Sequence, residues 1–132
     1  MSPTNNNGPP RGRAIGPVWV ERDLIKSKAF WALTGSAPQV LLAFLAKRQL
    51  ERVGRGRNRR YALVNNGQIV FTYIEAKRKY GLWDKSFRAS LEQLMEKGFL
   101  AVEEPGGGLM GHPSKYRLTD GWRTWTPPAS QQ

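Results

Sequence analysis

Cysteine is absent from this 132-residue chain, and His112 is its single histidine. Without cysteine there are no disulfides, thiolate metal sites or cysteine nucleophiles, and one imidazole leaves little for a metal site or a proton relay. No apolar run approaches the roughly 18 residues of a membrane-spanning helix, and the N-terminus lacks the apolar core of a signal peptide. We therefore expect neither a cofactor nor a bound metal, and no membrane partner.

Carboxylates are scarce as well: 10 Asp and Glu residues stand against 21 Lys and Arg, which gives a formal net charge of +11. Catalysis would need a base or a nucleophile with supporting partners, and the adjacent Glu103 and Glu104 would face opposite sides of a strand. We therefore expect that the protein is not an enzyme. The positive charge instead predicts a polyanionic partner.

Apolar and aromatic residues are plentiful, because the composition is 39% hydrophobic and includes five Trp, five Phe and four Tyr. This supports one folded domain, which we expect over residues 18–125. Residues 1–17 are rich in Asn, Gly and Pro and predict a flexible N-terminal arm, and residues 126–132 predict a flexible tail. Because aromatic side chains bury a large area, three tryptophans are expected in the core or at its rim: Trp31, Trp83 and Trp122.

The first strong helix signal lies at Ser36, which forms a capping-box pattern with Gln39. Residues 40–46 are apolar nearly all round, so this helix is predicted to be central and buried. Its solvated end is expected over residues 47–51, where polar side chains return. A shorter helix is predicted before it, over residues 27–33.

Two β-like runs follow, at residues 61–64 and 68–71, with Asn65, Asn66 and Gly67 between them. Asn-Gly is the strongest short hairpin signal, because both residues tolerate the positive φ of a tight turn. The two runs are therefore predicted to pair with each other as a β-hairpin.

Two further helices are predicted after this hairpin. Thr72 with Glu75 forms a second capping box, and Gly81 is expected to end the helix that it opens. Asp84 is expected to cap a helix over residues 84–97, whose apolar side chains recur at helical spacing: Phe87, Leu91, Leu94 and Met95.

A two-stranded ribbon is predicted next, from residues 99–103 and 115–118 with a glycine-rich loop between them. Helix, tight turn, second helix and ribbon is the order of parts in winged helix–turn–helix DNA-binding domains, which the chain resembles over about residues 36–119. The residues that carry the resemblance are Thr72–Ala76, Gly81-Leu82, Phe87, Leu91, Leu94, Gly98–Val102 and Ser114–Leu118.

The nearest resemblance is to the winged helices of plasmid and phage replication initiators and of small regulators of mobile elements. It implies an α+β fold with three or four helices and a small antiparallel β-wing. The arginine-rich insertion, with an extra β-hairpin before the helix–turn–helix, departs from the minimal pattern.

The helix over residues 84–97 is the expected recognition helix. Turning its apolar stripe to the core leaves a polar face of Lys85, Ser86, Arg88, Ala89 and Gln93. Recognition helices present such residues to base edges in the major groove, where Lys85 and Arg88 suit guanine or phosphate and Gln93 suits adenine. The alternative is an ordinary surface helix, which also carries polar residues opposite its core stripe.

Positive charge is concentrated in an arginine arm, residues 52–60, which contains Arg52, Arg55, Arg57, Arg59 and Arg60. Three interpretations stay open: an arm that follows phosphates or enters a minor groove, an RNA-binding segment, or a solvated loop. Further phosphate contacts are expected from the wing, residues 105–115, and from Lys77, Lys115 and Arg117.

The sequence therefore predicts a protein that binds double-stranded DNA with some sequence preference, with the helix over 84–97 in the major groove and the arginine arm and wing on neighbouring phosphates. A transcriptional regulator or a replication or accessory factor of a prokaryotic or mobile element fits, in the cytoplasm and associated with the nucleoid. The alternatives are a protein-docking subunit of a nucleoprotein complex, or RNA binding through the arginine arm. A homodimer is plausible because one such domain reads only a short half-site.

Overall fold

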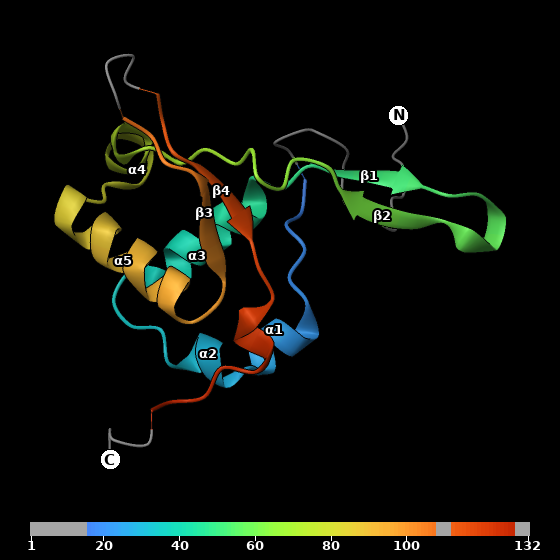
Figure 1. Ribbon diagram of the computed structural model, residues 1–132, viewed down its shortest axis with the longest axis horizontal. Helices are drawn as coiled ribbons and strands as arrows, with labels where there is room; N and C mark the ends of the chain where they lie inside the picture. Colours follow the sequence, from blue (N-terminus) through green and yellow to red (C-terminus); the bar gives the residue numbers. More distant parts are fainter. Residues whose placement is uncertain (1–15, 108–111, 129–132) are drawn as a thin grey trace.

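The computed structural model describes residues 16–107 and 112–128 and has an α+β fold (Figure 1). Its helices are α1 (Arg22–Lys26), α2 (Lys28–Trp31), α3 (Ala37–Ala46), α4 (Tyr73–Tyr80) and α5 (Asp84–Glu96), with short 3-10 turns η1 (Gly56–Asn58) and η2 (Gly121–Arg123). Its strands form two antiparallel pairs, β1 (Leu50–Val53) with β2 (Arg60–Leu63) and β3 (Leu100–Glu104) with β4 (Lys115–Leu118).

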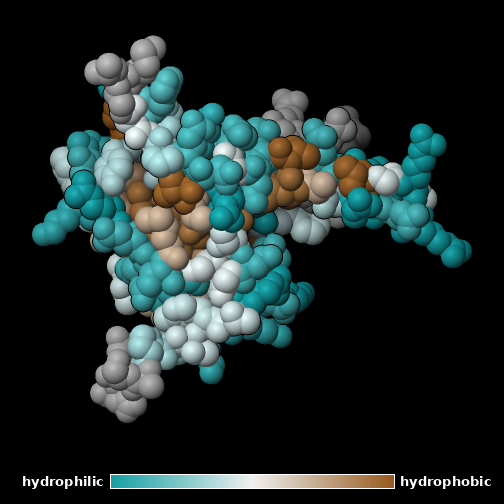
Figure 2. All heavy atoms as spheres, viewed as in Figure 1, coloured by the Kyte–Doolittle hydropathy of each residue, from teal (hydrophilic) through white to brown (hydrophobic). Residues whose placement is uncertain are grey.

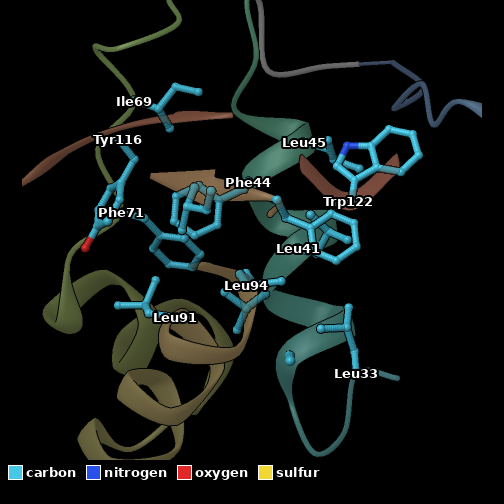
Figure 3. Packing of buried hydrophobic residues seen from close by; sticks show 14 of the residues in the cluster. Leu33, Leu41, Phe44, Leu45, Ile69, Phe71, Leu91, Leu94, Tyr116 and Trp122 are labelled. Atoms are coloured by element: carbon cyan, nitrogen blue, oxygen red, sulfur yellow. The ribbon is translucent and has the colours of Figure 1, made fainter. Parts of the chain in front are cut away.

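Helix α3 runs through the centre of the core (Figure 3). Phe44 on this helix is fully buried, and its ring lies 5.2 Å from that of Phe71 and 5.3 Å from that of Tyr116, both edge-on. The Phe71 ring in turn lies 4.8 Å from Phe87 on α5. The prediction of a central, buried helix is confirmed, and an aromatic cluster joins it to α5 and β4.

Helix α3 begins where it was expected to begin, but its capping box and its end differ from the prediction. Ser36 occupies the N-cap position but its side chain accepts no capping hydrogen bond, so the capping box with Gln39 does not form. The helix stops at Ala46, and most of the polar segment expected to continue it leads into β1. Lys47 is the C-cap of α3, and its ammonium donates to the Glu75 carboxylate over 2.6 Å.

The second capping box is half formed. The Thr72 hydroxyl accepts from the Glu75 backbone N–H over 3.0 Å, as predicted, while the Glu75 carboxylate is taken by Lys47. Gly81 ends α4 in the left-handed conformation, with φ +69°, which confirms its expected role. Helix α5 begins at Asp84, the first residue of the predicted range, but the N-cap position is held by Trp83 and not by Asp84.

The predicted hairpin between residues 61–64 and 68–71 is wrong. Strand β2 pairs with the upstream strand β1, in the register Leu50↔Leu63 to Val53↔Arg60, so most of the arginine arm forms the tip of this hairpin. In the downstream run, Ile69 pairs with Tyr116 of β4 through backbone hydrogen bonds of 3.2 and 2.8 Å. The extra hairpin exists, but its partner strands differ from those expected.

The Asn65-Asn66-Gly67 turn is a brace between elements. The Asn65 carboxamide accepts from the Gln49 N–H and donates to the Lys47 carbonyl, each over 2.9 Å. Asn66 does the same for β4, accepting from the Leu118 N–H over 2.7 Å and donating to its carbonyl over 3.2 Å. Both side chains thus replace missing strand partners, because backbone groups at the ends of sheets need hydrogen bonds.

The α1–α2 segment closes one end of the core. Ser27 caps α2 by accepting from the Phe30 N–H over 3.1 Å. Helix α2 lies within the helix predicted over residues 27–33, whereas α1 was not predicted. Of the three tryptophans expected in or around the core, only Trp122 is buried, at 5% exposure. Trp31, the last residue of α2, is 73% exposed, and Trp83, at the N-cap of α5, is 69% exposed. Their predicted burial is wrong.

The ribbon β3–β4 lies within one residue of its expected place. Its register shifts between Val102 and Glu104, so Glu103 is a bulge residue. Much of the glycine-rich loop, residues 108–111, lies outside the described residues.

Replacing Asn65 with alanine should lower the free energy of unfolding by about 1–3 kcal/mol, because two backbone groups at the base of the hairpin lose their partner. Asn58→Ala is the matched control, since Asn58 lies exposed at the hairpin tip. Urea unfolding followed by tryptophan fluorescence measures both. Equal stabilities of the two variants would show that Asn65 does not brace the fold.

Candidate nucleic-acid interface

Helices α4 and α5 are joined by a tight turn. Gly81 reverses the chain, and the Leu82 N–H donates to the Ala76 carbonyl over 3.1 Å. The Tyr73 ring on α4 lies edge-on to Phe87 on α5 at 4.9 Å. These contacts, together with the packing of α5 on α3, fix the direction in which the first turns of α5 point.

The first two turns of α5 present four of the five predicted recognition residues to solvent. Lys85, Ser86, Arg88 and Ala89 are exposed, while Phe87 between them is fully buried. The Arg88 guanidinium is cationic at physiological pH, and hydrogen bonding to Tyr73 raises its pKa further. The resulting surface combines two cations with two small side chains, so a ligand can approach the helix backbone closely.

Gln93 does not belong to this surface. Its carboxamide accepts from the Thr34 N–H over 2.9 Å and donates to the Thr34 carbonyl and hydroxyl, each over 3.1 Å. These bonds hold the loop before α3 against α5 and use both ends of the amide. The adenine contact expected of Gln93 is therefore not available in this structure, and the residue has a structural role.

The core-facing stripe of α5 also differs at one position. Phe87, Leu91 and Leu94 are buried as predicted, but Met95 is 37% exposed, and Ser90 is buried in its place.

Helix α4 adds basic residues that sequence reasoning missed. Lys77, which was predicted, is exposed, with its ammonium 3.9 Å from the Asp84 carboxylate and 5.3 Å from the centre of the Trp83 ring. Arg78 and Lys79 follow it and are also exposed. The run of three cations in the last turn of the helix, just before Tyr80 and Gly81, was the signal that could have identified them.

The wing cations have acidic neighbours. Arg117 pairs with the bulge residue Glu103 over 3.0 Å, and Lys115 lies 3.8 Å from Glu104. Both pairs are partly exposed, so they are weak and can open. Phosphate contacts by Lys115 and Arg117 therefore have to compete with carboxylates.

The arginine arm carries no such pairs. All five of its arginines are exposed, and none has a carboxylate within 4.0 Å among the residues that the structure describes. The tip has a regular turn, because the Asn58 N–H donates to the Arg55 carbonyl over 2.8 Å and closes η1. Gly54, at φ +88°, has no room for a side chain, because a Cβ would lie 2.2 Å from the Asn58 carbonyl oxygen.

The two basic surfaces lie far apart. Figure 1 places the start of α5 at one end of the long axis and the β1–β2 hairpin at the other. In Figure 2 the hydrophilic tip of the hairpin extends away from the body of the molecule. The expectation that the arginine arm touches phosphates next to the recognition helix is therefore not met by the arrangement of the elements.

The chain matches no protein-family model, and neither a curated protein nor a solved structure is significantly similar to it. Within residues 16–107 and 112–128, no group of three His, Asp or Glu side chains is arranged to hold a metal ion. The described part of the chain also contains no helix with the length and apolar character that crossing a membrane requires.

Replacing Gln93 with alanine should cost about 0.5–1.5 kcal/mol of stability, because its three hydrogen bonds to Thr34 are lost. Glu92→Ala, on the same helix and exposed, is the control. Chemical denaturation gives both values. If the Gln93 variant kept its stability but preferred a different DNA sequence, Gln93 would be a recognition residue and not a structural one.

Proposed function

We propose that the chain is a winged helix–turn–helix protein that binds double-stranded DNA. The observation that carries the proposal is the exposed, cationic start of α5, which follows α4 and the tight turn at Gly81. A helix presented in this way places its N-terminal residues against base edges.

The dimensions of α5 support a major-groove contact. Its 13 residues span about 20 Å, and the major groove, about 12 Å wide, admits a helix. Ser86 and Ala89 allow the backbone to come close, Arg88 can bind guanine through two hydrogen bonds, and Lys85 reaches guanine or a phosphate.

The flanking elements supply phosphate contacts. Lys77, Arg78 and Lys79 follow one another at the end of α4, beside the turn that leads into α5. Phosphate contacts set the position of a protein on the duplex, and base contacts set its sequence preference. In this arrangement Lys115 and Arg117 exchange their carboxylate partners for phosphates.

A regulator, or a replication or accessory factor of a prokaryotic or mobile element, is the role that fits such a protein. A single recognition helix reads only a short half-site, so binding as a homodimer to a repeated site is part of the proposal. Association with the nucleoid follows from binding DNA.

Fluorescence anisotropy with duplex DNA, single-stranded DNA and structured RNA of equal length, each at several salt concentrations, tests the proposal. We expect preference for the duplex with an affinity that falls steeply as salt rises, because bound cations release counterions. Preference for RNA or single strands, or equal weak binding to all three, would contradict it.

Replacing Arg88 with alanine should change which duplex sequence is preferred, with a loss of about 1–3 kcal/mol at the affected base pair. Arg22→Ala on α1 removes the same charge from another part of the surface and should leave the preference unchanged. Competition binding over a panel of duplexes measures the difference. If both variants weakened all sequences equally, Arg88 would be a phosphate contact.

A further inference from the structure

The direction of the arginine arm is fixed by the fold. Its strands β1 and β2 are held in register by backbone pairing, and Asn65 ties their base to the end of α3. The same turn joins β4 through Asn66, so the hairpin leaves the body at a set angle. In Figure 1 that direction leads away from α5.

A duplex seated on the start of α5 lies at the opposite end of the long axis from the arginine arm. A four-residue β-ribbon extends about 13 Å, which is longer than the Debye length of about 8 Å at physiological ionic strength. The charge at the tip therefore acts separately from the charge on α4 and α5.

The tip has the properties of a binding surface. Arg55, Arg57 and Arg59 lie in and beside the closed turn η1, and Gly54 before it has a conformation that leaves no room for a side chain. No carboxylate of the described residues neutralises them, in contrast to the cations of the wing. Like charges crowded in this way repel one another, so a polyanion that binds them relieves a cost of the unbound state.

The geometry points to a second duplex-binding site on the β1–β2 hairpin, so that one chain joins two separate duplex segments. The major groove admits a two-stranded β-ribbon as well as a helix, and arginine binds both phosphates and guanine through paired hydrogen bonds. The inference rests on the proposed function, because α5 has to hold the first duplex.

The test mixes the whole protein with an excess of short duplexes, half labelled with a donor fluorophore and half with an acceptor. We expect energy transfer between duplexes, and sedimentation should give a complex of one protein with two duplexes. Bridging by two proteins that each hold one duplex would overturn the inference, and the sedimented mass distinguishes the two cases.

Three variants locate the second site. Arg55→Ala with Arg57→Ala and Arg59→Ala should abolish energy transfer and lower the salt slope by about 0.9 per lost phosphate contact. Arg22→Ala with Lys26→Ala and Lys28→Ala removes the same charge from exposed positions on α1 and α2 and should keep it. Gly54→Ala keeps every arginine but distorts the tip, and should also reduce energy transfer.

Failure of the inference and failure of the proposed function give different results. If one duplex binds per chain and its binding still depends on Arg88, the second site does not exist but the recognition surface stands. If no duplex binds, both are overturned. If the triple arm variant and its charge-matched control lose energy transfer equally, net charge explains the bridging and the hairpin is not a site. Binding of RNA in place of the second duplex would also overturn it.

Discussion

The arrangement of this protein depends on the two carboxamides of Asn65 and Asn66. Each accepts from one backbone N–H and donates to one carbonyl, and together they tie the end of α3, the base of the β1–β2 hairpin and the strand β4 to a single turn. Each carboxamide bonds backbone groups that have no strand partner, and so takes the place of the missing ladder hydrogen bonds. The orientation of the arginine arm relative to α4 and α5 follows from these bonds, and so does the separation of the two basic surfaces.

The cations of the protein fall into two kinds. Lys77 on α4 and the wing cations have carboxylates nearby, such as Asp84 for Lys77 and Glu103 for Arg117. The arginines of the hairpin, like Lys85 and Arg88 on α5, have none within 4.0 Å among the described residues. A cation that is paired with a carboxylate attracts anions less strongly. A ligand has to fit the geometry of the site to replace that carboxylate. An uncompensated cluster attracts any polyanion over a longer range. The paired cations of α4 and the wing therefore favour ligands that fit their geometry, whereas the charge of the hairpin favours polyanions in general.

Local signals predicted local structure well. The Thr72 cap, the stop at Gly81, the ribbon and the buried face at Phe87, Leu91 and Leu94 all followed from spacing and turn chemistry. Two caps failed locally, at Ser36 and Asp84, but the larger failures concern partners distant in the chain. The Asn-Gly pair indicated a turn, but it did not indicate that Asn65 and Asn66 bond Gln49 and Leu118. Helical spacing placed Gln93 on the polar face of α5, but it did not show that Thr34 lies against this face and binds the Gln93 side chain. For the candidate site, the exposed start of α5 was predictable, while the distance between it and the arginine arm was not, because it depends on how the hairpin is anchored.

The β1–β2 hairpin has a consequence for the solution behaviour of the protein. Within the described residues its sheet contains only two strands, so both outer edges present unpaired backbone groups, and Tyr61 and Val64 expose apolar surface beside them. Such edges readily pair with the same edge of another molecule and begin aggregation, and charged side chains are a common protection against this. The arginines keep two hairpins apart by repulsion as long as no polyanion covers them. If the proposed second site exists, solubility and ligand binding are linked through the same side chains, and a hairpin made neutral would lose both.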